Sequence, residues 1–230
     1  MTDQRESQLT IALPRLDRTT ADQRGITIAD FLVPIRVSER ISARVRHIAL
    51  IVAGALFIAI TANFAVLVPG SPVPLTGQTF SVLLVGGALG MRRGILATSL
   101  YLVIGFFLPV YAQQASGVSH IASVDGGTLI LGATGGYLLG FVIASGLVGR
   151  LAELGWDRNL AGAVGAMAIG NVIIYVFGLP WLMAATGMNV ADTIAAGLTP
   201  FLITDLIKLA IAAGVFPLAW WVVGRRPGER

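Results

Sequence analysis

The chain has 230 residues, 55% of them hydrophobic and only 12% charged, with a mean hydropathy of +0.80; about a quarter of the residues of a soluble domain are charged, so this composition predicts an integral membrane protein. Sixteen Lys and Arg against twelve Asp and Glu give a formal charge of +4, but these charges flank apolar runs, which indicates membrane orientation and not nucleic-acid binding. The lack of cysteine excludes disulfides and thiol chemistry, and two isolated histidines argue against a metal site.

Residues 1–45 are predicted to form a polar, basic extension in the cytoplasm. Eight arginines and six acids precede His47, a pattern unlike a cleaved signal peptide, whose short basic region directly precedes its apolar core. The stretch between Ile26 and Val45 holds arginines together with apolar Ile28, Phe31, Leu32, Ile35 and Ile41. This part is expected to lie along the cytoplasmic lipid surface; an unstructured extension without a role is the alternative.

Six apolar runs follow, and each is expected to form a transmembrane helix, since a span takes about 20 residues. They are His47–Val68, Gln78–Met91, Gly94–Val110, Thr128–Arg150, Asn159–Gly178 and Thr199–Val223. The second run is short and is expected to be tilted or extended into its flanks. The predicted fold is therefore all-α: a compact six-helix membrane domain over residues 46–224, followed by a cytoplasmic tail at 225–230.

The distribution of basic residues predicts the orientation of these helices. With the N-terminus inside, the extension, the second and fourth connections and the tail hold fifteen of the sixteen basic residues. The three outer connections, residues 69–77, 111–127 and 179–198, contain no Lys or Arg. Because cytoplasmic loops carry the excess of Lys and Arg, both termini are expected in the cytoplasm of a multi-pass plasma-membrane protein.

The sixteenth basic residue, Lys208, is the only lysine and lies inside the sixth run with Asp205 three residues before it. Residues at i and i+3 are neighbours on a helix, and the 1.5 Å rise places the two about 9 Å and about 14 Å below Thr199, in the outer half of the bilayer. Intramembrane charges usually mark substrate or proton pathways. We therefore expect a ligand-contacting pair in an outward-facing cavity; a structural ion pair is the alternative.

Further polar residues are predicted at the same depth. Thr76 and Gln78 begin the second run, and Thr134, Gly136 and Tyr137 lie in the outer part of the fourth. Glycine lets a backbone approach a ligand, and tyrosine supplies a ring with a hydroxyl. Taken singly, each residue also fits helix capping, helix packing or an interfacial aromatic belt. Their common placement predicts one pocket for a small polar solute.

Several catalytic and energising motifs are absent from the sequence. There is no G-x-x-x-x-G-K-[ST] nucleotide site, no H-E-x-x-H and no G-x-S-x-G, so the chain is not expected to be an enzyme or to use ATP itself. Small residues spaced four apart in the first run, Ala49/Ala53 and Ala55/Ala59, allow close helix contact. Such contact can lie within the chain or with another membrane protein.

Three segments together carry a family resemblance. They are Ser71–Leu84 (SPVPLTGQTFSVLL), Gly132–Phe141 (GATGGYLLGF) and Pro200–Lys208 (PFLITDLIK). The chain resembles the BioY family, the biotin-binding S components of energy-coupling factor transporters, over about residues 47–223. One departure is Ala133, where family members often carry proline; alanine removes a restraint on the helix start.

The resemblance implies a six-helix subunit that captures biotin from outside and works with a transmembrane coupling subunit and two cytoplasmic ATPases. It implies ligand contacts by the D-x-x-K pair, Asp205 and Lys208, and by the segment from Thr134 to Tyr137, and coupling-subunit contacts by the four alanines. Biotin is then a transported ligand and no cofactor is expected. Asp205 is expected to accept ureido N–H groups, with Lys208 donating to the ureido carbonyl or pairing with the carboxylate.

Two other functions fit the residues. The same fold could capture another vitamin, or a proton-coupled secondary transporter could use Asp205 and Lys208 as a relay.

Overall fold

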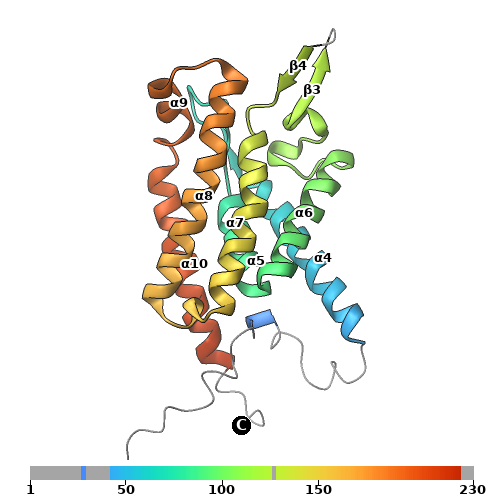
Figure 1. Cartoon of the computed structure of the whole chain (residues 1–230), viewed down its shortest axis with the longest axis vertical. Coiled ribbons are helices and arrows are strands. Elements are labelled where there is room, and N and C mark those ends of the chain that lie inside the picture. Colours follow the sequence, from blue (N-terminus) through green and yellow to red (C-terminus); the bar gives the residue numbers. More distant parts are fainter. Residues whose placement is uncertain (1–26, 30–41, 126–127, 224–230) are drawn as a thin grey trace, which may run out of the picture.

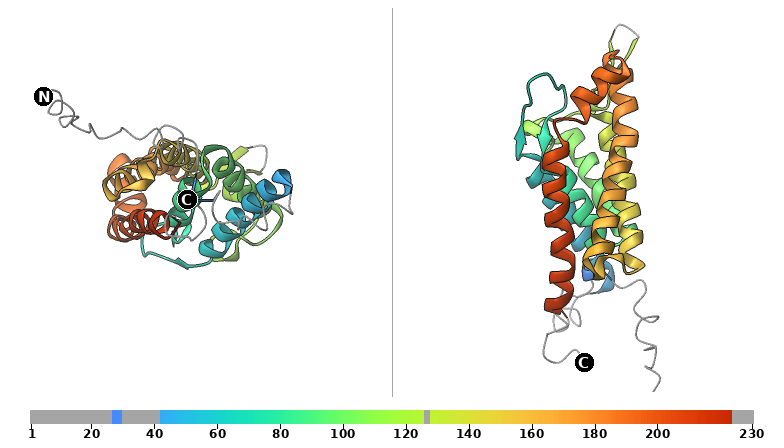
Figure 2. Two further views of the ribbon diagram at one scale, coloured as in Figure 1. Left: turned by 90° about the horizontal axis from the view of Figure 1, so that it is seen from below. Right: turned by 90° about the vertical axis from the view of Figure 1, so that its left-hand side faces the viewer.

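The computed structural model describes residues 27–29, 42–125 and 128–223, and its long helices run side by side as a bundle (Figure 1). These helices are α4 (Ala43–Ala62), α5 (Gln78–Leu89), α6 (Met91–Phe107), α7 (Gly135–Glu153), α8 (Leu160–Thr186) and α10 (Leu202–Val223). Seen along the bundle, α4 and α10 lie on opposite sides (Figure 2). The predicted helical bundle is confirmed in this coarse form.

Each predicted run overlaps one of these helices, but several boundaries were wrong. The first helix ends at Ala62 and not Val68, because β1 (Ala65–Val66) pairs with β2 (Leu75–Thr76). The fourth begins at Gly135 and not Thr128, because β4 (Thr128–Leu131) pairs with β3 (Ala122–Asp125) in an antiparallel hairpin. The fifth continues to Thr186, and α9 (Val190–Gly197) was not predicted.

Four of these helices are long and apolar enough to cross a membrane: α4, α7, α8 and α10. The apolar helix α5 has only 12 residues and α6 has 17, so the count of six spans stays a prediction. The two shorter helices meet at Gly90, whose φ of +81° is a conformation that favours glycine. This single residue caps both helices and turns the chain sharply between them.

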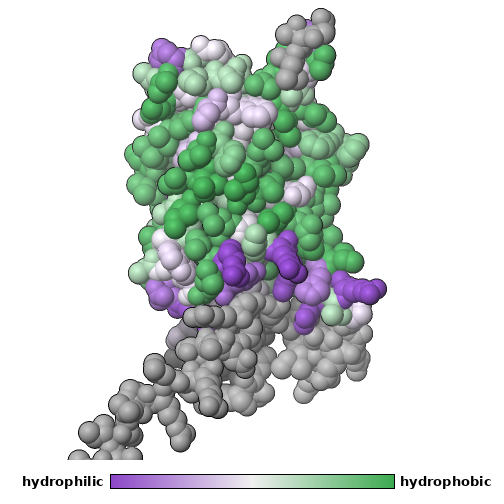
Figure 3. Space-filling model, in the orientation of Figure 1, coloured by the Kyte–Doolittle hydropathy of each residue, from purple (hydrophilic) through white to green (hydrophobic). Residues whose placement is uncertain are grey.

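The interior of the bundle is built around α7. In its most apolar stretch 67% of residues are buried, against 22–28% for the other three candidate spans. Small residues bring its backbone close to α8: a methyl group added to Gly140 would lie 3.0 Å from Ile174 Cα. Large apolar side chains such as Ile60, Val172 and Leu206 point outward, and a broad hydrophobic band covers the flank (Figure 3). Outward-facing apolar side chains of this extent suit a lipid environment.

The two ends of the bundle differ in charge. Arg92 and Arg93 start α6, Arg150 lies in the last turn of α7, and Arg158 precedes α8. The alternating helix directions bring them to one end, the lower one in Figures 1 and 3, where hydrophilic side chains gather. We call this the arginine end.

A short piece of the N-terminal extension packs against this end. Thr27, Ile28 and Ala29 are buried, and Ile28 belongs to the hydrophobic core. The prediction that Ile28 faces lipid was therefore wrong, because the protein itself supplies its apolar surroundings. The other apolar residues predicted on the lipid surface, and the predicted tail at 225–230, lie outside the described residues.

Candidate ligand-binding cavity

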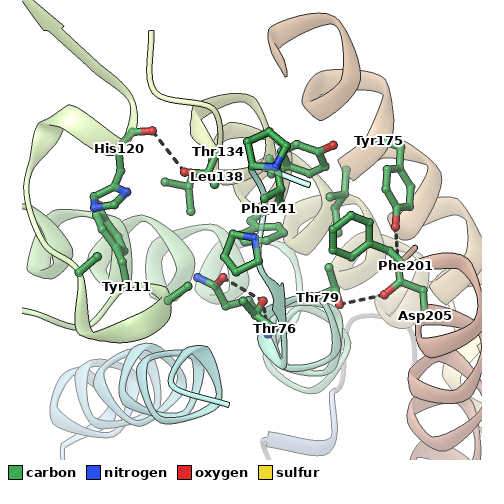
Figure 4. Close-up of a pocket in the computed structure, with 18 of the residues that line it drawn as sticks. Thr76, Thr79, Tyr111, His120, Thr134, Leu138, Phe141, Tyr175, Phe201 and Asp205 are labelled. Atoms are coloured by element: carbon green, nitrogen blue, oxygen red, sulfur yellow. Dashed lines mark hydrogen bonds between the residues drawn. The ribbon is translucent and has the colours of Figure 1, made fainter. Parts of the chain in front are cut away.

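A cavity of about 210 Å³ opens at the end of the bundle opposite the arginine end. The start of α5, the segment around η1 (Ala112–Gln114) and η2 (Val118–His120), and helices α7, α8 and α10 contribute to its walls (Figure 4). Six of the seven ligand-binding residues predicted from the sequence line it: Thr76, Gln78, Thr134, Tyr137, Asp205 and Lys208.

The ion pair predicted in the last helix is present on the cavity wall. Lys208 Nζ lies 3.2 Å from Asp205 Oδ1, and it also donates to the Thr76 carbonyl at 2.7 Å and to Thr79 Oγ1 at 3.2 Å. An ammonium has three hydrogens to donate, so these three acceptors satisfy it. The two opposite charges cancel, so the pair has no net charge. Asp205 is 5% exposed and the Lys208 side chain 20%, so both are largely shielded from water.

Helix α8 supplies further donors to Asp205. The Tyr175 hydroxyl donates to Asp205 Oδ2, and Asn171 Nδ2 approaches the same oxygen at 3.5 Å. Thr79 Oγ1 approaches Oδ1, also at 3.5 Å. The two contacts at 3.5 Å are long for hydrogen bonds and therefore weak. Asp205 thus keeps acceptor capacity that a ligand with N–H groups can use.

Gln78 is held in a fixed orientation beside the cavity. Its side-chain oxygen accepts from the Thr76 hydroxyl at 3.0 Å, and its amide nitrogen donates to the Tyr101 hydroxyl. Gln78 is buried, so this pairing satisfies a polar group that would otherwise be costly to bury.

Aromatic rings form the apolar part of the wall. Tyr137 and Tyr175 meet edge to face with ring centroids 6.2 Å apart, and Phe141 and Phe201 also line the cavity. The Tyr137 hydroxyl donates to the Gly197 carbonyl at 2.9 Å. Tyr137 therefore offers its ring, while its hydroxyl anchors α9.

The wall farthest from Asp205 in Figure 4 contains Tyr111 and His120. Their rings meet edge to face with centroids 5.6 Å apart, and the Tyr111 hydroxyl donates to the Leu102 carbonyl at 2.6 Å. Burial raises the pKa of Tyr111 to about 12, so it remains a neutral phenol. The Thr134 hydroxyl donates to the backbone carbonyl of His120 at 3.3 Å.

Gly136, the seventh predicted residue, lies elsewhere. A methyl group at its Cα would collide with Trp181 and with the Phe177 carbonyl of α8. Gly136 is absent from the cavity lining, so the structure places it at the contact of α7 with α8. Its predicted ligand role is corrected to helix packing.

The predicted partner surface on α4 is divided by the fold. Ala49 and Ala53 are exposed, whereas Ala55 and Ala59 are only 1% and 8% exposed because they face the chain's own core. The prediction for Ala55 and Ala59 was therefore wrong for this conformation. Contact of Ala49 and Ala53 with another subunit stays a prediction.

Sequence reasoning missed Asn171 and the roles of Tyr111 and His120. Asn171 had a signal, because it is a polar side chain in the middle of the long apolar run that became α8. Tyr111 and His120 had none beyond their residue types. Within the described residues, no group of three or more His, Asp or Glu side chains could hold a metal ion.

Comparisons with known proteins agree on one family. The model of the BioY family matches residues 37–225. A probable biotin transporter BioY of Pyrococcus horikoshii is 36% identical over 160 residues, 69% of this chain and 88% of the relative. The biotin transporter BioY of Thermotoga maritima is 34% identical over 165 residues, 71% of this chain and 90% of the relative.

The fold also matches a solved structure. The crystal structure of the S-component for biotin from an ECF-type ABC transporter superposes with a TM-score of 0.68. The match covers 79% of this chain and 95% of that chain at 20% identity, so it shows a shared fold.

Proposed function

Because the chain belongs to the BioY family, we propose that it is the substrate-capture subunit of a vitamin transporter and binds biotin in the cavity described above. The observation that carries this proposal is the neutral Asp205–Lys208 pair on the wall of a largely apolar cavity. Drug-sized ligands occupy pockets of roughly 300–1,000 Å³, so a cavity of about 210 Å³ suits a compact ligand.

The chemistry of biotin is complementary to these walls. Its ureido ring has two N–H donors and a carbonyl acceptor. Asp205 can accept ureido N–H groups in place of its two long contacts, from Thr79 and Asn171. Lys208 can turn from Thr79 to the ureido carbonyl while it keeps its bond to the Thr76 carbonyl. The aromatic and aliphatic wall then holds the sulfur-containing ring and the alkyl chain.

In the proposed orientation the cavity opens on the outer face of the plasma membrane. Arg92, Arg93 and Arg150 lie at the opposite end, and cytoplasmic ends carry the excess of basic residues. Six spans with both termini inside are consistent with that placement. The chain is proposed to have no enzymatic activity and no cofactor.

Energy for import is proposed to come from other subunits. Since the sequence has no nucleotide-binding motif, a transmembrane coupling subunit and two cytoplasmic ATPases would drive transport. Ala49 and Ala53, exposed on α4, are the proposed contact with the coupling subunit because small residues allow close helix approach.

The direct test is equilibrium binding of labelled biotin to the purified, detergent-solubilised chain without ATP. We expect saturable binding of the labelled biotin. Excess unlabelled biotin should displace it, and excess thiamine or riboflavin should not. Displacement by either other vitamin would contradict the assignment of the ligand. In cells, uptake that collapses with a protonophore at constant ATP would favour a proton-coupled transporter instead.

A further inference from the structure

The Asp205 end of the cavity is a poor place for a negatively charged group. Lys208 is the only cation on the described cavity lining, and Asp205 already neutralises it at 3.2 Å. A ligand carboxylate placed there would bring a second negative charge beside Asp205. A ligand with one neutral polar end and one carboxylate is therefore favoured with its neutral end at this pair.

The other side-chain donors on the cavity wall are mostly engaged. The Gln78 amide donates to Tyr101, the Tyr111 hydroxyl to Leu102, and the Thr134 hydroxyl to the carbonyl of His120. The His120 imidazole remains: it contacts the Tyr111 ring edge to face, and no hydrogen bond from it to another described residue is present. His120 is neither fully buried nor exposed, and it lines the cavity.

We propose that His120 binds the carboxylate of the ligand and so selects the free acid over its neutral derivatives, an inference that rests on the proposed function. The imidazole carries an N–H donor in its neutral form and two when protonated, and a hydrogen bond to a carboxylate is charge-assisted. The contact with Tyr111 orients the ring, and Figure 4 places His120 across the cavity from Asp205. The ligand would then lie along the cavity, with its ureido ring at Asp205 and Lys208.

The experiment compares two ligands on several proteins. Dissociation constants for biotin and for biotinamide, which lacks the negative charge, are measured on the full chain and on His120→Phe. Phenylalanine keeps a ring against Tyr111 but has no N–H donor. We expect the full chain to prefer biotin by about 10-fold or more, the effect of about 1.4 kcal/mol, and His120→Phe to reduce the preference to below about 2-fold.

Two further variants serve as references. His47→Phe changes the chain's other histidine, on α4 near the arginine end, and should leave the preference unchanged. His120→Gln retains an N–H donor and should retain part of the preference. The ratio of the two constants is an internal reference, because a loss of folded protein lowers binding of both ligands equally.

The outcomes separate this inference from the proposed function. If biotin binds and His120→Phe keeps the full preference, the role of His120 is wrong while biotin capture stands. A parallel loss of both ligands in His120→Phe and His120→Gln, with the ratio preserved, overturns the role as well. If the full chain binds neither ligand, the proposed function itself fails.

Discussion

Replacing Lys208 with methionine should destabilise the protein by leaving a buried carboxylate without its cation. At an effective dielectric constant of about 20, two charges 3.2 Å apart attract each other by about 5 kcal/mol. Removing one member of a buried pair costs about 3–5 kcal/mol. Because Tyr175 still donates to Asp205, we expect the lower value, about 3 kcal/mol.

The second substitution, Asp205→Asn, should then restore stability. The double variant Asp205→Asn/Lys208→Met has no charge to bury, and the oxygen of the introduced amide can still accept from Tyr175. We expect it to be about 2 kcal/mol more stable than Lys208→Met alone, which corresponds to about 4–8 °C in melting temperature. The assay is thermal unfolding of detergent-purified protein followed by tryptophan fluorescence.

Leu206→Met is the matched control on the same helix, because Leu206 is 64% exposed and lies outside the pair; its melting temperature should be unchanged. If Asp205→Asn lowers the stability of Lys208→Met further, the two charges do not depend on each other. That result would refute the argument from a buried pair.

Three further predictions concern packing, pH and assembly. Gly136→Ala should destabilise the protein by about 1–3 kcal/mol through overpacking. Gly214→Ala should not, because its added methyl group has no atom within 4 Å apart from the adjacent backbone of its own helix. Equal melting temperatures would contradict the α7–α8 contact. Burial raises the pKa of Asp157, although Trp220 donates a hydrogen bond to it. The folded state therefore holds the carboxyl proton more strongly than the unfolded state does. Stability should fall as the pH rises above 3.8, the ordinary pKa of an aspartate. Asp157→Asn should remove that part of the pH dependence in melting curves, and identical curves would contradict it. Ala53→Trp should lower ATP-dependent biotin uptake by the assembled transporter without changing biotin affinity; normal uptake would remove this residue from the subunit contact.

The sequence predicted those features that depend on local pattern. Asp205 and Lys208 could be paired because i and i+3 are neighbours on any helix, and apolar run length located each long helix. The strand Thr128–Leu131 was missed because a short apolar run does not distinguish strand from helix. Its pairing with Ala122–Asp125 makes it a strand, and the sequence of one segment does not show which other segment it pairs with.

Helix geometry also explains the errors at single residues. Residues 53 and 55 are about 200° apart around a helix, so Ala49/Ala53 and Ala55/Ala59 could not share one face. The second pair is buried in the core. Gly136 and Tyr137 differ by about 100°, and the structure turns Tyr137 toward the cavity and Gly136 toward α8. His120 reached the cavity through the path of an irregular segment, which no periodicity predicts.

Biotin capture by the cavity beside Asp205 and Lys208 should need no ATP. Isothermal titration of biotin into the purified chain and into Lys208→Met, side by side, measures this binding. We predict one saturable site per chain, weakened about 10-fold or more in the variant because a hydrogen bond to a charged group contributes about 1.5–3 kcal/mol. Equal biotin affinity in both proteins, with both folded, would contradict it.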